Sequence, residues 1–164
     1  MIMLIRNLSA IGLLVLCFVL PACAANKQSE YAAALKQWRP LAEQGNAVGQ
    51  FNLGEMYAKG LGVPQDDTEA MRWYRLAAEQ RHAGAQYALG EIYANGQGVP
   101  QNYVLAHMWL NLAAVQGDEL AVKMRDYYAY LMSPAQIAEA QKLAREWKPT
   151  KEKSRQPGLR FLVF

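Results

Sequence analysis

Two stretches of this chain match each other position by position at a constant distance of 36 residues. The matched positions hold leucine, glycine, tyrosine and tryptophan, and the pairs are Leu53 and Leu89, Gly54 and Gly90, Tyr57 and Tyr93, Gly60 and Gly96, Gly62 and Gly98, and Trp73 and Trp109. A constant register over so many positions is an internal repeat, and a unit of this length cannot bury its apolar face alone. The pattern therefore predicts an all-α solenoid in which neighbouring units stack on one another.

The residues of the two copies also resemble a known family. From Ala47 to Ala78, and again from Ala83 to Ala114, the sequence is similar to the Sel-one-like repeat, a relative of the tetratricopeptide repeat. The resemblance covers about residues 31–147. It implies a right-handed superhelix of antiparallel helix pairs, here with two full 36-residue repeats and capping helices.

The rest of the chain is predicted to consist of partial copies and caps. The expected order is a half repeat at 30–45, full repeats at 46–81 and 82–117, a C-terminal cap at 118–147 and a basic, disordered tail at 148–164. Pro40 lies inside the first predicted helix, which it is expected to kink or to shift at its start. Arg81 stands where Gly45 and Gly117 occupy the equivalent positions, so a non-glycine residue must take up the chain reversal there.

The first helix of each full repeat contains a glycine in its interior. Gly54 and Gly90 each cost their helix about 1 kcal/mol relative to alanine. Close approach of a partner helix, which any side chain would push away, explains a glycine that recurs at one repeat position. Tyr57 and Tyr93 follow three residues later and are expected to pack on the same face.

The second helix of each repeat is predicted to start at a good N-cap residue. Asp66 and Asn102 occupy these positions, and Glu69 is placed to complete a capping box with Asp66. Trp73 and Trp109 share a face with the small alanines of these helices and are expected in the core between repeats. The alternative is that the two tryptophans form a ligand platform.

The turns between the paired helices contain two glycines each and could be mistaken for phosphate-binding loops. They run from Gly60 to Pro64 and from Gly96 to Pro100, the second glycines being Gly62 and Gly98. No predicted strand precedes them and no G-K-[ST] follows, so the phosphate-loop motif is not met. The glycines are instead expected to supply positive-φ positions.

The start of the chain has the features of an export signal. An apolar run at 8–20 follows a single positive charge at Arg6, and small residues lead up to Ala24, so residues 1–24 are predicted to be a signal peptide. A transmembrane helix is the alternative, but the run is shorter than the ~20 residues needed to span a bilayer. Two processing routes stay open, namely ordinary cleavage after Ala24 and a lipobox ending at Cys23, which would carry a lipid anchor.

Charge and cysteine content narrow the possible functions. The mature chain keeps at most one cysteine, so no intramolecular disulfide is expected. Residues 148–164 carry a net charge of +4, whereas residues 25–147 carry −2. The repeat body has no basic stripe of the kind that nucleic-acid binding requires, which argues against that function.

The mature chain is short of catalytic side chains. His82 and His107 are isolated from each other and from any metal-ligand spacing; His82 is expected to be exposed and His107 partly buried. Of its serines, Ser29 lies near the N-terminus of the mature chain, Ser133 lies at a predicted helix cap, and Ser154 lies in the tail. No nucleophile, base and orienting group converge in the sequence, so the chain is expected to be non-catalytic, with no cofactor or metal.

A binding function remains, since solenoids of helix pairs present a concave surface lined by their first helices. We expect a monomeric, exported adaptor or scaffold that binds a protein or peptide in the cell envelope or outside the cell. The candidate contact residues on the first helices are Asn52, Glu55, Lys59, Glu91 and Asn95. Two alternatives stay open: an envelope enzyme that hydrolyses peptidoglycan or β-lactams, and a purely structural lipoprotein anchored through Cys23.

Overall fold

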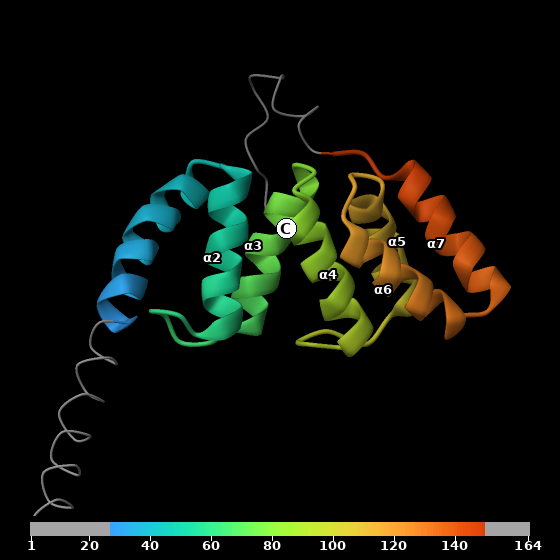
Figure 1. Ribbon diagram of the computed structural model, residues 1–164, viewed down its shortest axis with the longest axis horizontal. Helices are drawn as coiled ribbons and strands as arrows, with labels where there is room; N and C mark the ends of the chain where they lie inside the picture. Colours follow the sequence, from blue (N-terminus) through green and yellow to red (C-terminus); the bar gives the residue numbers. More distant parts are fainter. Residues whose placement is uncertain (1–26, 150–164) are drawn as a thin grey trace, which may run out of the picture.

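The computed structural model describes residues 27–149, and every regular element in that range is an α helix (Figure 1). Residues 27–43 form the first helix. It is followed by α2 (Ala47–Lys59), α3 (Asp67–Glu79), α4 (Ala83–Asn95), α5 (Tyr103–Ala114), α6 (Glu119–Tyr130) and α7 (Pro134–Glu146). The predicted signal peptide at 1–24, with Cys23, and residues 150–164 of the predicted tail lie outside the described residues.

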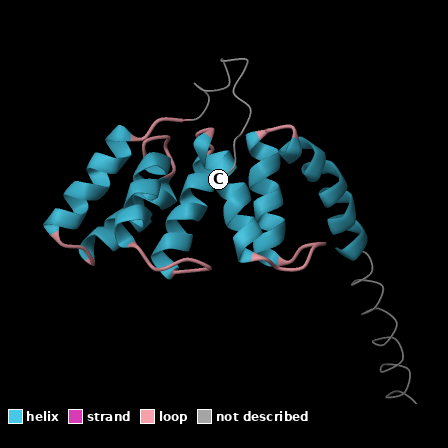
Figure 2. Ribbon diagram, turned by 180° about the vertical axis from the view of Figure 1, so that it is seen from behind, coloured by secondary structure: helices cyan, strands magenta, loops and turns pink. Residues whose placement is uncertain are grey.

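The helices are stacked along the long axis of the molecule. Figures 1 and 2 show the helix over residues 27–43 at one end and α7 at the other. Each helix from α2 onward packs against the next one in the chain, except that α7 packs against α5. This arrangement confirms the all-α solenoid that the repeat predicts.

The interior glycines lie at close contacts between the paired helices. A Cβ atom placed on Gly54 would lie 2.8 Å from the ring of Tyr74 in α3, and one placed on Gly90 would lie 2.6 Å from Leu110 in α5. Carbon atoms in contact normally stay 3.5–4.0 Å apart. Glycine is therefore required at both positions by the neighbouring helix, and not by backbone conformation.

Tryptophan and leucine fill the space between repeats. Leu53 and Leu89 are fully buried, and Trp73 and Trp109 each expose only 8% of their surface. Trp73 packs in one cluster with Leu53, while Trp109 lies in another with Leu89. The two tryptophans thus belong to separate parts of the core and do not form the shared ligand platform considered above.

Arg81 takes up the chain reversal after α3 with a left-handed backbone. Its φ is 68°, and the glycines at the equivalent positions, Gly45 and Gly117, have φ values of 85° and 93°. A residue with a Cβ atom is strained in this region of φ. The turn has therefore kept its geometry despite the change of residue.

Two glutamine pairs, which were not predicted from the sequence, each join the two helices of one repeat and connect that repeat to the unit before it. Gln80 donates from Nε2 to Oε1 of Gln50 at 2.7 Å, and Gln116 donates to Gln86 in the same way at 2.6 Å. Gln50 and Gln86 are buried and donate in turn to the backbone carbonyl oxygens of the preceding second helices, those of residues 42 and 78. Gln50 and Gln86 are 36 residues apart, as are Gln80 and Gln116, so an alignment of the two repeats could have indicated that these glutamines have a shared role.

Two expectations about helix starts need correction. Asp66 is the N-cap of α3 and accepts hydrogen bonds from the N–H groups of Thr68 and Glu69, but the Glu69 side chain is paired with Arg72 instead of completing a capping box. Arg72, three residues further along α3, is the stronger partner for the Glu69 carboxylate because it carries a full charge.

The first helix, over residues 27–43, continues through Pro40, so the proline does not mark the start of this helix.

Candidate functional site

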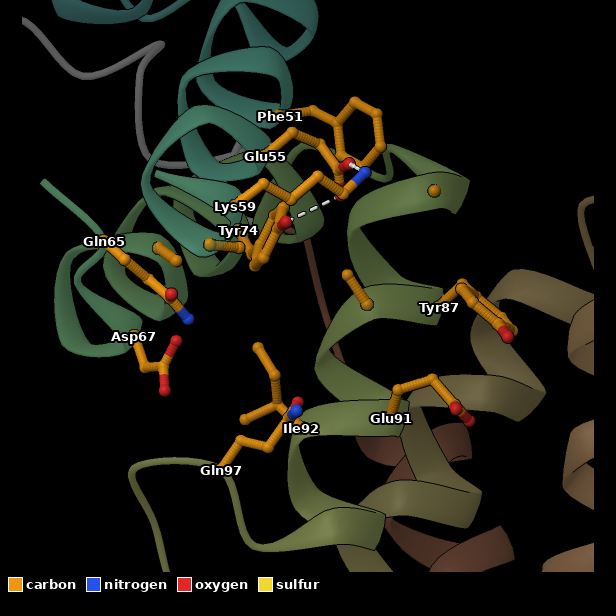
Figure 3. A pocket seen from close by; sticks show the side chains of 14 residues that line it. Phe51, Glu55, Lys59, Gln65, Asp67, Tyr74, Tyr87, Glu91, Ile92 and Gln97 are labelled. Carbon is orange, nitrogen blue, oxygen red and sulfur yellow. Dashed lines mark hydrogen bonds and ion pairs between the residues drawn. The ribbon is translucent and has the colours of Figure 1, made fainter. Parts of the chain in front are cut away.

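A groove of about 400 Å³ lies between the first helices of the two repeats, α2 and α4. The first turns of α3 close one side, and the loop after α4 closes the lower end (Figure 3). Its lining comprises Phe51, Glu55, Ala58, Lys59, Gln65, Asp67, Ala70, Tyr74, Gly84, Tyr87, Ala88, Glu91, Ile92 and Gln97. The stacking of repeats therefore creates the groove, since neither repeat supplies both walls.

The groove combines an apolar floor with acidic edges. The floor is formed by the small side chains of alanines and by Ile92, and the alanines leave room above it. Figure 3 shows Ile92 and Gln97 pointing into the groove. Glu55, Asp67 and Glu91 contribute three carboxylates against the single ammonium group of Lys59. A concave surface with an apolar floor and a few charged groups is the usual form of a binding site.

Glu55 is held in place from two sides. Its carboxylate accepts a hydrogen bond from the Tyr74 hydroxyl at 2.7 Å and forms an ion pair with Lys59 one turn further along α2 (Figure 3). Burial, followed by the hydrogen bond to Glu55 and its negative charge, raises the pKa of the Tyr74 hydroxyl. The tyrosine therefore stays protonated and acts as a permanent donor to Glu55.

Glu91 is held in a similar way by a residue from outside the two repeats. Its carboxylate accepts a hydrogen bond from the Tyr128 hydroxyl in α6 at 3.3 Å. Burial raises the pKa of Glu91, and this hydrogen bond opposes the rise. Burial and then the charge of Glu91 raise the pKa of Tyr128 to about 12. Glu91 is thus a half-buried carboxylate whose ionised form is less stable than in water.

The two glutamates are equivalent in the repeat, but their tyrosines are not. The position equivalent to Tyr74 in the second repeat is Leu110, which has no hydroxyl. Tyr128 approaches from α6 and supplies the missing donor. A carboxylate–tyrosine pair is therefore present at both walls of the groove although the repeat itself encodes only one.

The structure brings together some of the candidate contact residues and separates others. Glu55, Lys59 and Glu91 line the groove. Asn52 does not, and its side-chain amide donates to the backbone carbonyl of Val48 at 2.8 Å. Asn95, at the end of α4, is exposed outside the groove. Both asparagines therefore lie outside this groove, and their role as contact residues stays a prediction.

Several lining residues were not anticipated. Phe51 and Tyr87 are both aromatic and stand 36 residues apart, so they occupy one repeat position and could have been found by aligning the copies. Asp67 and Gln97 come from different elements, the start of α3 and the loop after α4. These two residues reach the same end of the groove only because one repeat packs on the next, so no local sequence pattern indicates them.

Both histidines are less accessible than expected. His82 is half-buried, stacks on the Phe51 ring with centroids 4.6 Å apart, and caps α4 by accepting a hydrogen bond from the Ala85 N–H on Nδ1. His107 exposes only 4% of its surface, and its Nδ1 has no hydrogen-bond partner among the described residues. Burial lowers the pKa of both rings.

Within residues 27–149, no group of three or more histidine, cysteine or carboxylate side chains is placed to hold a metal ion.

Comparison with known proteins identifies the repeat. The Sel1 repeat family model matches residues 47–82 and 83–118. The chain contains two Sel1 repeats. The Sel1 repeat is a unit that generally serves in scaffolds for protein–protein interaction.

Two solved structures of Sel1-repeat proteins resemble this one. The first is a protective antigen of uropathogenic Escherichia coli with an SLR fold, at 29% identity and a TM-score of 0.71 over 84% of this chain and 31% of that one. The second is a Sel1 repeat protein from Oxalobacter formigenes, at 40% identity and a TM-score of 0.56 over 60% of this chain and 39% of that one. This chain therefore spans between three and four tenths of the length of these relatives. A search of curated proteins gave no match.

Proposed function

We propose that this Sel1-repeat protein is an exported, non-catalytic scaffold and that the groove between α2 and α4 holds a segment of a partner protein. The observation that carries the proposal is the groove itself, with its apolar floor between two carboxylates that are each oriented by a tyrosine. Orienting side chains before binding reduces the entropy lost when a partner arrives. The coarser role, protein–protein interaction, is general for this repeat family.

The lining supports binding better than hydrolysis. Among its residues there is no serine, cysteine or histidine, and the ends of Glu55 and Glu91 are already engaged by tyrosine hydroxyls. A hydrolytic site needs a nucleophile or an activated water with a base beside it. The same features favour a partner segment that brings apolar side chains for the floor and positive charge for the carboxylates.

Export is supported by the sequence and by one relative. Residues 1–24 have the charge, apolar run and small residues of a signal peptide, with Cys23 as a site of lipid attachment if the lipobox is used. The similar protein of uropathogenic Escherichia coli is a protective antigen. No helix within residues 27–149 has both the length and the apolar character needed to cross a bilayer.

A crosslinking pull-down from the native cell envelope tests this function. The Ala88→Arg variant places a long charged side chain on the groove floor, and Ala138→Arg makes the same change on the exposed face of α7. We expect the native chain and Ala138→Arg to capture the same partner, and Ala88→Arg to lose it while melting near the native temperature. Equal capture by all three proteins would show that the partner binds elsewhere.

A further inference from the structure

The groove carries more negative than positive charge, and one segment of this chain carries the opposite charge. Residues 150–164 contain four basic residues and one acidic residue, a net charge of +3. The same segment ends in Leu159–Phe164, a run of apolar residues interrupted only by Arg160. Its composition therefore matches both properties of the groove, the apolar floor and the acidic edges.

The described part of the chain ends near the turn that leads into α4, one wall of this groove. Trp147 and Arg81 line the same small cavity, and Arg81 lies three residues before Gly84, which lines the groove. Trp147 also packs against the core cluster that contains Ala85 of α4. The described residues thus end at Pro149, two residues after Trp147 and near the N-terminal end of α4, where Gly84 is the first residue of that helix to line the groove.

The lengths are compatible with docking in the same chain. Nine residues, 150–158, can span up to about 30 Å when extended, which is ample for reaching Gly84. From Gly84 to Ile92 the groove follows eight residues of α4, about 12 Å, which equals about four residues of extended chain. Leu159–Leu162 has this length, and its alternate residues point to opposite sides.

We propose that residues 150–164 dock in the groove between α2 and α4 of the same chain. Leu159 and Phe161 occupy the apolar floor, and Arg160 lies on the other side of the segment toward the carboxylates of the groove edge. If the groove also binds a partner, as proposed above, the docked segment competes with that partner. The docking itself does not depend on the partner and is tested separately.

Photo-crosslinking in the full chain tests the docking. With p-benzoylphenylalanine in place of Phe161, irradiation is expected to join this position to peptides of α2 or α4 that line the groove. Crosslinked protein should run as a monomer, and its yield should not change on dilution. Crosslinks spread over the other faces, or crosslinks only between two copies, would overturn the proposal.

Charge removal provides the second measurement. Asp67→Asn combined with Glu91→Gln should lower the yield about fivefold, since the charge contacts of one exposed and one half-buried carboxylate are lost. The matched control, Asp126→Asn combined with Glu139→Gln, removes two exposed charges outside the groove and should leave the yield unchanged. Equal yields from both double variants would also overturn the proposal.

The two proposals can fail independently. If the crosslinks miss the groove while Ala88→Arg still abolishes partner capture, the docking is wrong and the proposed function stands. If the crosslinks lie in the groove while partner capture is unaffected by Ala88→Arg, the docking stands and the proposed function is wrong. If both hold, a chain with Arg160→Gln and Phe161→Ser should capture more partner than the native chain does.

Discussion

Trp147, which follows α7, meets Trp109 of α5 edge-on, with ring centroids 6.0 Å apart and an interplanar angle of 70°. Trp109 belongs to the last full repeat, and Trp147 covers it from outside the repeat pattern. The end unit of a solenoid has no following repeat to cover its apolar face. This contact is therefore expected to help close the stack at its C-terminal end.

Removal of the closing ring is expected to destabilise the whole stack. Trp147→Ala should lower the free energy of unfolding by about 2 kcal/mol, because a large, partly buried aromatic side chain is lost. Trp147→Phe keeps a ring against Trp109 and should cost clearly less. Thermal melts followed by circular dichroism measure both variants, and equal stability of Trp147→Ala and the native chain would show that α7 does not cap the stack.

The close approach at Gly90 should make even a methyl group harmful. Gly90→Ala places a Cβ atom 2.6 Å from Leu110, and we expect a loss of about 1–3 kcal/mol from overpacking, more than the ~1 kcal/mol that alanine adds as a helix former. Gly84→Ala is the control in the same helix, since its nearest neighbour is the end of the Phe51 ring at 3.3 Å. A higher melting temperature for Gly90→Ala than for Gly84→Ala would contradict this explanation.

The helices were predictable because the repeat register is visible in single residues. Gly54 and Gly90 indicate helix contacts because a costly residue recurs at one position. The same comparison could have predicted a capping role for His82, whose equivalent in the first repeat is Asn46. Asn46 caps α2 through its side chain as His82 caps α4, but Asn46 is exposed and therefore does not indicate the partial burial of His82.

The groove was only half predictable. Glu55 and Lys59 are four residues apart on α2 and therefore lie on the same face of that helix, so the sequence indicates them. Asp67 reaches the groove only because α3 packs behind α2, and Tyr128 reaches Glu91 from a helix that lies outside the repeat. Contacts of this kind depend on the superhelical stacking of the units, which a pattern within one unit does not specify.

The glutamine pairs within the repeats are expected to behave as buried hydrogen bonds. Gln86→Leu removes the acceptor of Gln116 and the donor to the Ala78 carbonyl, and leaving buried polar groups without partners should cost about 1–3 kcal/mol. Gln116→Ala should cost less, because Gln116 is exposed and water replaces its partner. A double-mutant cycle on Gln86 and Gln116 measures the coupling, which should be close to zero only if the pair contributes nothing.

Acid should destabilise the fold through the buried histidine. Burial, and then the charge of Arg125, lowers the pKa of His107, while Asp126 opposes this, so the unfolded chain takes up a proton more readily than the folded one. Stability is then full above the ordinary histidine pKa of 6.5 and falls as the pH drops below it.

The histidine contribution is measured from melts between pH 7.5 and pH 5, a range of about 1 to 1.5 units on either side of the unperturbed histidine pKa. His107→Leu should flatten the fall in stability. His82→Asn removes the other histidine with a lowered pKa while keeping an N-cap, and it should remove a further part of the slope. An unchanged pH dependence in the double variant would show that other groups cause the acid sensitivity.

Glu91→Gln should separate stability from binding. Burial raises the pKa of Glu91, so its ionised form does not favour folding, and glutamine can still accept the hydrogen bond from Tyr128. The variant should therefore melt at or above the native temperature at pH 7. In the native chain, the raised pKa of Glu91 increases the stability of the fold as the pH falls through that pKa, and Glu91→Gln should lack this increase.

Partner capture is the second readout for this residue. Glu91→Gln should capture the envelope partner several-fold less well than the native chain, whereas Glu139→Gln, an exposed change on α7, should capture it equally well. Tyr128→Phe removes the hydroxyl that orients the carboxylate and should give an intermediate loss, because the charge remains but its position is no longer restrained. A Glu91→Gln protein that melts well below the native temperature and still captures the partner would make Glu91 a structural residue and move the binding site away from α4.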